Sequence, residues 1–203
     1  MAKTPTLQQV AADAAHCEAC DLYRRATQTV FGEGPASARL MLVGEQPGDR
    51  EDLAGHPFVG PAGRVLDEAL TDAGIDRADV YLTNAVKHFK WKARGKRRLH
   101  DKPNRREIVA CKQWLDAELE LVDPEVIVVL GATAGQALFG SKFRLGTARD
   151  QHDLELAGIP VVATYHPSAA LRADSGQARD EIRGALVADL RRARAIAAPA
   201  GSR

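Results

Sequence analysis

The stretch RLMLVGEQPGDREDLAGHPFVGPAG (residues 39–63) joins a short apolar run to a long loop. The run, residues 39–44, is typical of a strand that is buried on both faces of a parallel sheet, and it ends at a glycine. Residues 44–63 contain five glycines and three prolines, a composition that brings backbone close to a ligand. The sequence therefore predicts a buried strand that leads directly into a binding loop.

The rest of the chain repeats this alternation of strands and helices. Further strands are predicted at 80–86, 126–131 and 159–164, and helical periodicity covers 62–73, 105–122, 132–139 and 179–196. Such alternation favours right-handed crossovers. We predict an α/β protein: a three-layer α/β/α sandwich with a mainly parallel central sheet of about four strands. One domain, residues 1–203, is expected.

Four loops follow the carboxyl ends of these strands, where ligands bind in open parallel sheets. Each polar or aromatic residue there has an ordinary structural explanation when it is taken alone. Phe58 could pack in the core, and His166 could be a hydrogen-bonded structural histidine. Their convergence is what predicts a cleft, formed by Glu45, Gln46, Asp49, Phe58, Asn84, His100 and His166.

Positive charge is concentrated in one segment. The chain has a formal net charge of +1, but residues 87–106 carry +9 and the remainder carries −8. Phe89 and Trp91 are interleaved with these cations, as in proteins that bind a polyanion with stackable bases. The alternative is a charged loop without a specific partner.

The two ends of the chain give further expectations. The N-terminus lacks an apolar signal core, and an apolar run long enough to span a membrane is absent, so we expect a cytoplasmic protein that binds no membrane. A monomer is expected, with a disordered tail at 197–203. Cys17 and Cys20, in a C-x2-C pair within the N-terminal segment 1–20, suit metal or redox chemistry.

The binding loop resembles a known motif. GEQPGDREDLAGHPFVGPAG is similar to the first motif of the iron–sulfur-containing uracil-DNA glycosylases of family 4, and the likeness extends over residues 17–192. Asn84, Cys111, residues 128–133 and His166-Pro-Ser168 follow in the order of that family. The resemblance implies the uracil-DNA glycosylase fold and a uracil pocket. Phe58 would stack on uracil, Asn84 would bind the base edge and His166 would bind O2. Gly44 and Asp49 would also bind uracil, and Ser168 would bind DNA.

Two departures from family 4 resemble the UdgX branch of the superfamily. Gln46 replaces the usual alanine, and KRRLH (residues 96–100) is an additional basic segment. UdgX-type proteins attach covalently to uracil-containing DNA through the histidine of such a segment. The resemblance implies that His100 attacks C1′ of the sugar and that Glu45 orients the imidazole. Gln46 would hold the sugar or the loop, and Lys96, Arg97 and Arg98 would neutralise phosphates of DNA, preferably single-stranded.

The resemblance also implies a [4Fe–4S] cluster. Cys17, Cys20 and Cys111 would be ligands, and His88 occupies the place of the fourth cysteine of the hydrolytic relatives. A Cys3His set is acceptable for a cluster, and it also suits zinc, the alternative.

Two other functions stay open at this stage. The first is a conventional uracil-DNA glycosylase that turns over by means of a water activated by Glu45; among the sequence features, KRRLH argues against it. The second is a metal-containing single-strand DNA-binding protein without activity. The set Glu45, Phe58, Asn84 and His166 argues against this second function.

Overall fold

A computed structural model describes residues 4–197. This part of the chain is built around a central five-stranded sheet. Its parallel strands are β1 (Leu40–Gly44), β2 (Val80–Asn84), β5 (Val126–Leu130) and β7 (Ile159–Thr164), and β6 (Glu155–Leu156) pairs antiparallel to β7 at the edge. The strand order is β2-β1-β5-β7-β6. The predicted parallel sheet is confirmed, although β2 ends at Asn84, two residues before the predicted limit.

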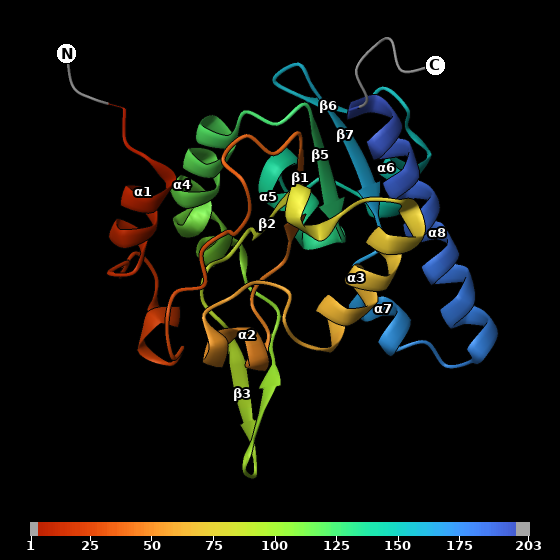
Figure 1. Ribbon diagram of the computed structural model, residues 1–203. Coiled ribbons are helices and arrows are strands. Elements are labelled where there is room, and N and C mark those ends of the chain that lie inside the picture. Colours follow the sequence, from red (N-terminus) through yellow and green to blue (C-terminus); the bar gives the residue numbers. More distant parts are fainter. Residues whose placement is uncertain (1–3, 198–203) are drawn as a thin grey trace.

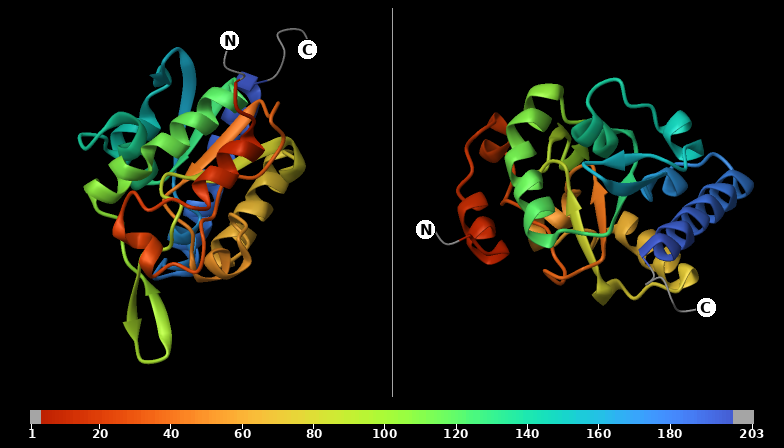
Figure 2. Two further views of the ribbon diagram at one scale, coloured as in Figure 1. Left: turned by 90° about the vertical axis from the view of Figure 1, so that its left-hand side faces the viewer. Right: turned by 90° about the horizontal axis from the view of Figure 1, so that it is seen from above.

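Helices cover both faces of the sheet (Figures 1 and 2). The helices are α1 (Leu7–Ala14), α2 (Asp49–Ala54), α3 (Pro61–Ala73), α4 (Arg105–Val122), α5 (Ala132–Phe139), α6 (Leu145–Asp150), α7 (Ser168–Leu171) and α8 (Gly176–Ala197). Helices α4 and α5 pack on one face, and α3 and α8 pack on the other. The predicted three-layer α/β/α sandwich is therefore confirmed.

Strand β1 shows why these apolar runs become central strands. All five of its residues are buried, and successive side chains point to opposite faces. Met41 and Val43 join the core under α4 and α5, whereas Leu40 and Leu42 join the core under α3 and α8. A run without polar alternation thus fills two cores at once, as the sequence predicted.

The basic segment differs from the predicted loop. It forms an antiparallel hairpin of β3 (Trp91–Arg94) and β4 (Arg97–His100), which projects from the body of the protein at the end where the parallel strands terminate (Figure 1). Gly95 has φ +59° at the first position of the two-residue turn, as a type II′ turn requires. These strands were not predicted because residues 91–100 show no sustained alternation of apolar and polar residues. The short helices α1, α2, α6 and α7 were not predicted either.

Two expectations concern the ends of the chain and the membrane. Of the tail predicted at 197–203, Ala197 is the last residue of α8, and residues 198–203 lie outside the described part. Among residues 4–197, none of the helices is both long and apolar enough to cross a bilayer.

Gly63, in α3, should be a position where even one methyl group is destabilising. A Cβ there would lie 1.8 Å from the carbonyl oxygen of Phe58, whose φ of +56° already sets an unusual backbone turn. We expect Gly63→Ala to lower the free energy of unfolding by about 2–3 kcal/mol in urea titrations.

Gly146→Ala in α6 is the matched control, because a Cβ at Gly146 meets nothing within 4 Å. Alanine is the better helix former, so this variant should be equal to the parent or more stable by about 0.5–1 kcal/mol. Equal midpoints for Gly63→Ala and the parent would contradict the close approach of α3 to Phe58.

Candidate functional site

A cleft of about 920 Å³ opens beyond the carboxyl ends of the parallel strands. Eight residues of the sequence prediction line it: Glu45, Gln46, Asp49, Phe58, Asn84, His100, His166 and Ser168. They come from the ends of β1, β2, β4 and β7 and from the loop that contains α2. The structure thus brings the predicted cleft residues together, although their individual roles are a separate question.

Glu45 lies at the centre of the cleft. It follows β1, and its Oε2 accepts a hydrogen bond from Thr133 at the start of α5, after the neighbouring strand β5. Its Oε1 lies 3.0 Å from Nε2 of His100. Burial acts to raise the pKa of Glu45, but the hydrogen bonds from His100 and Thr133 outweigh it and lower the pKa below the usual value. Glu45 is therefore an ionised acceptor at neutral pH. Thr133 was not among the predicted site residues.

His166 is held as a neutral hydrogen-bond donor. The backbone N–H of Ser168 lies 3.2 Å from its Nδ1 and can only donate, so the ring proton is on Nε2. The Ser168 hydroxyl lies 2.7 Å from the same Nδ1 and accepts from Arg172 at 2.8 Å. Burial lowers the pKa of His166 to about 4. Ser168, predicted to contact DNA, thus orients His166 in this structure.

Phe58 and Asn84 form one wall of the cleft, and both pack closely against Gly44 at the end of β1. A Cβ on Gly44 would lie 2.4 Å from Oδ1 of Asn84 and 2.7 Å from Cζ of Phe58, so only glycine allows both side chains to approach β1. The Phe58 and His166 ring centroids are 6.2 Å apart. The wall therefore offers an aromatic surface, a side-chain amide and an imidazole N–H, which together suit a planar heterocycle with polar edges.

Gln46 fastens the base of the hairpin. Its Nε2 donates to the carbonyl oxygens of Lys90 at 3.2 Å and Asp101 at 3.1 Å, and its Oε1 accepts from the Lys90 N–H at 3.2 Å. Lys90 precedes β3 and Asp101 follows β4. One amide group thus holds both strands of the hairpin beside Glu45, and His100 is the last residue of β4.

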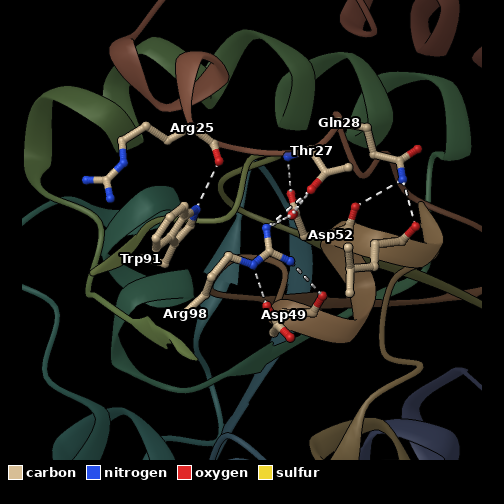
Figure 3. A network of polar contacts seen from close by, with 8 residues as sticks. Arg25, Thr27, Gln28, Asp49, Asp52, Trp91 and Arg98 are labelled. Carbon is tan, nitrogen blue, oxygen red and sulfur yellow. Dashed lines mark hydrogen bonds and ion pairs between the residues drawn. The ribbon is translucent and has the colours of Figure 1, made fainter. Parts of the chain in front are cut away.

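Arg98 anchors the hairpin from its inner face (Figure 3). Its Nε lies 2.6 Å from Oδ1 of Asp49, and its Nη1 lies 2.6 Å from Oδ2 of the fully buried Asp52. Asp52 also accepts from the N–H of Thr27 at 2.9 Å. The guanidinium is therefore engaged by α2 and the N-terminal segment. This position differs from the phosphate contact predicted for Arg98, and it also occupies the Asp49 carboxylate that was predicted to line a uracil pocket.

Strand alternation separates the cations of the hairpin into two groups. Trp91, Arg98 and His100 share the face toward the body, and the Trp91 indole N–H donates to the Arg25 carbonyl at 2.9 Å. Lys92, Arg94, Arg97 and Leu99 share the opposite face. Lys96 and Arg97 are exposed, as a phosphate contact requires.

The predicted metal ligands are partly assembled. Cys17 accepts a hydrogen bond from the Trp114 indole at 3.1 Å, and Cys111 accepts one from the Lys87 backbone N–H at 3.1 Å. Burial raises the pKa of the Cys111 thiol to about 11, and the neighbouring Cys20 and Cys17 also raise it. N–H donors to sulfur are typical of thiolate-ligated centres.

His88 has the tautomer of a metal ligand. Its Nε2 lies 2.9 Å from the Thr29 hydroxyl, which donates its own proton to the Ala14 carbonyl at 3.0 Å. Nε2 must therefore donate, which leaves the lone pair on Nδ1. Among residues 4–197, however, no three His, Cys, Asp or Glu side chains are close enough to hold one metal ion. Three thiols and one imidazole nitrogen are the donor types that a thiolate-rich group would need.

Comparison with known proteins identifies the family. Residues 31–191 match the model of the uracil DNA glycosylase superfamily. The chain is 39% identical to a type-4 uracil-DNA glycosylase of Thermotoga maritima, over 89% of this chain and 88% of that protein. It is 38% identical to a type-4 uracil-DNA glycosylase of Pyrobaculum aerophilum, over 77% of this chain and 80% of that protein.

The chain belongs to the uracil-DNA glycosylase superfamily. The predicted resemblance to this superfamily is confirmed, and the match includes every residue of the cleft described above. Cys17 and Cys20 precede residue 31, so they lie before the matched superfamily domain.

Burial of His166 predicts a loss of stability in mild acid. The unfolded chain binds a proton on this ring below pH 6.5, whereas the folded protein binds it only near pH 4. This contribution is complete above pH 6.5 and is lost as the pH falls toward 4. We expect the free energy of unfolding to fall by on the order of 1–2 kcal/mol between pH 7.5 and 5, with partial solvent access reducing the effect.

His166→Gln is the control for this pH dependence. The variant should lose the part of the pH dependence that comes from this ring. Urea titrations at both pH values measure the difference, and identical pH dependences for parent and variant would contradict the neutral state of the half-buried His166.

Proposed function

We propose that this protein excises uracil from DNA and then retains the strand through a covalent bond between His100 and C1′ of the deoxyribose, as UdgX-type proteins do. The supporting observation is the contact between Nε2 of His100 and Oε1 of Glu45, 3.0 Å apart in the cleft. A glycosylase that uses water needs a free carboxylate at this place. In this protein the hairpin places the imidazole of His100 against that carboxylate.

Uracil would enter the cleft after it leaves the base stack. Phe58 offers a stacking surface, and the Asn84 amide can donate to O4 and accept from N3–H, a pattern that cytosine does not present. Flipping costs least where the base is unpaired, so we expect a preference for single-stranded DNA. The protein would act as a monomer in the cytoplasm.

Bond cleavage leaves charge at two places. When C1′–N1 breaks, the bonding electron pair leaves with uracil as an anion, and the sugar becomes an oxocarbenium-like cation. The Nε2–H of His166 would donate to O2 of the leaving uracil, because the ring is neutral and its proton is on that nitrogen. Ionised Glu45 would stabilise the cationic sugar.

Capture would then use the imidazole of His100. An unprotonated ring nitrogen donates its lone pair to C1′ and forms the new C–N bond. The ring N–H proton passes to Glu45, so the product is a neutral N-substituted imidazole. Gln46 and Arg98 would act as positioning residues, because they hold the base and the inner face of the hairpin.

The outer face of the hairpin would contact phosphates. Arg94, Lys96 and Arg97 are exposed there, and Lys102 lines the cleft. Ser168 would contact DNA only after it releases His166, because its hydroxyl and its backbone N–H both contact Nδ1 of that ring. Arg98 belongs to the anchor and not to the phosphate contact in this proposal.

Cys17, Cys20, His88 and Cys111 would hold a [4Fe–4S] cluster. The group would supply structural cross-linking there. Through it, the four residues would tie the N-terminal segment to the base of the hairpin and to α4, and Cys17 and Cys111 already accept N–H hydrogen bonds.

A turnover glycosylase is the second candidate. Ionised Glu45 favours it, because the same carboxylate could activate a water molecule if His100 moved away. The non-enzymatic single-strand binder has less support, because a cleft with a neutral donor and an ionised carboxylate is assembled for chemistry.

Substitution of His100 tests the capture step. Parent protein, mixed with end-labelled uracil-containing single-stranded DNA and boiled in detergent, should give a shifted band in nearly stoichiometric yield. His100→Ala should give no shifted band, because the nucleophile is missing, and it should release uracil and leave alkali-labile sites.

Arg97→Gln is the matched control within the hairpin. It removes one exposed cation, so it should weaken DNA binding and reduce its salt dependence, and it should still form the adduct. A boiled, shifted band from His100→Ala would refute capture by His100. Repeated turnover by the parent without an adduct would favour the second candidate.

Iron content tests the cluster. Protein purified without oxygen should absorb visible light and carry about four iron atoms per chain. Cys111→Ala should lose both properties, whereas His88→Cys should keep them because a thiolate replaces the imidazole. A colourless parent with one zinc ion per chain would contradict the cluster.

A further inference from the structure

A charged pair is buried at the end of β2, next to the backbone of Asn84. The Lys87 and Glu118 side chains are 1% and 0% exposed, and the Lys87 ammonium contacts Oε2 of Glu118. Lys87 lies beyond the end of β2, and Glu118 lies in the last part of α4. Burial of both charges is costly, and a well-packed apolar pair is often as stable. The pair therefore calls for an explanation beyond stability.

The ammonium of Lys87 is fully satisfied. Besides Glu118, it donates to the Thr83 hydroxyl at 2.6 Å and to the backbone carbonyl of Asn84 at 2.8 Å. Thr83 in turn donates to Glu118 at 2.9 Å. The lysine side chain thus folds back over the two residues that end β2, and its charge is held in one position by three partners.

Glu118 fixes the other end of this arrangement. It accepts from the Gly32 N–H at 2.8 Å and the Tyr81 hydroxyl at 3.2 Å. Gly32 leaves no room for a Cβ, which would lie 2.4 Å from Oε1 of Glu118. The carboxylate therefore cannot follow a shifted lysine without breaking its contacts to Gly32 and to strand β2.

The contact with Lys87 restrains the backbone of Asn84. Its carbonyl lies where β2 leaves the sheet, and the N–H groups of the next residues, Ala85 and Val86, donate to the carbonyls of Gly44 and Glu45 at 2.9 and 3.0 Å. Lys87 holds the same peptide from the other side. The backbone that carries the Asn84 amide is thus fixed between the end of β1 and the buried charge.

We infer that Lys87 and Glu118 are positioning residues for recognition of the pyrimidine edge by Asn84. This inference rests on the proposed function, in which Asn84 reads uracil. Neither residue lines the cleft, so they act through the peptide of Asn84. A pair that contributed only stability would not alter the affinity of folded protein for free uracil.

The test uses the full chain with Lys87→Met and Glu118→Gln together. Methionine keeps the volume and the backbone N–H that bonds Cys111, and glutamine keeps an acceptor for Gly32. The control is Lys112→Met with Asp116→Asn, which removes an exposed ion pair from the same helix α4. Urea titrations and iron content identify the folded fraction of each variant.

Two quantities are compared for the folded protein: inhibition by free uracil, and the rate constant for loss of uracil from single-stranded DNA at saturating protein. In the double variant we expect about tenfold or more weaker inhibition by uracil and a rate constant that is lower by about tenfold or more, because a displaced amide misaligns the base. Binding of a thymine oligonucleotide should stay within about twofold, and the Lys112/Asp116 control should match the parent.

Two outcomes would overturn the inference. Unchanged inhibition by uracil in the folded double variant would leave the pair a purely structural role while the proposed function stands. Unchanged inhibition in Asn84→Ala would remove the assigned role of Asn84, and the inference with it. If the double variant does not fold, Glu118→Gln alone decides by the same inhibition measurement.

Discussion

The site depends on the hydrogen bonds that the ionised carboxylate of Glu45 accepts. Glu45 follows β1, whose connection runs to β2 on one side of the sheet. The connection from the adjacent strand β5 runs to β7 on the other side, and Thr133, which follows β5, donates a hydrogen bond to Glu45. Adjacent parallel strands whose connections diverge leave a crevice at this place. The hydrogen bonds from Thr133 and His100 lower the pKa of Glu45 against the effect of burial. Glu45 therefore carries a negative charge in a cleft, where its electrostatic interactions are stronger than in bulk water.

The hairpin is an addition whose position needs anchors of its own. Isolated two-stranded hairpins are marginally stable. Gln46 bonds both strands at the base, and Arg98 reaches the buried Asp52, so polar contacts replace the apolar face that the hairpin lacks. Arg98 is largely buried between two carboxylates, and a buried charge that lost one of these partners would be costly. The orientation of His100 thus depends on residues that belong to the scaffold.

The sequence predicts the scaffold better than the hairpin, for physical reasons. Strands buried on both faces are continuous apolar runs, so β1, β5 and β7 were predicted nearly to the residue. The hairpin faces solvent on one side and carboxylates on the other, and its large apolar residues, Trp91 and Leu99, lie on opposite faces, so hydrophobicity gives no period. A count of charges could not separate Arg98, which bonds α2, from Arg97, which is exposed, nor detect that Lys87 is buried. Partners far away in the chain, Asp52 and Glu118, make that difference.

Placement of His100 bears on the competition between imidazole and water in the proposed reaction. A water molecule at Glu45 must be bound and oriented anew, whereas His100 already bonds the carboxylate and is tethered at the last residue of β4. Effective concentrations of well-oriented groups reach about 10⁵ M or more, far above that of bulk water. In the proposed reaction, capture would therefore need no unusually reactive histidine. It would need an ordinary imidazole held at the carboxylate, and the contacts of Gln46 and Arg98 anchor the hairpin that carries His100 there.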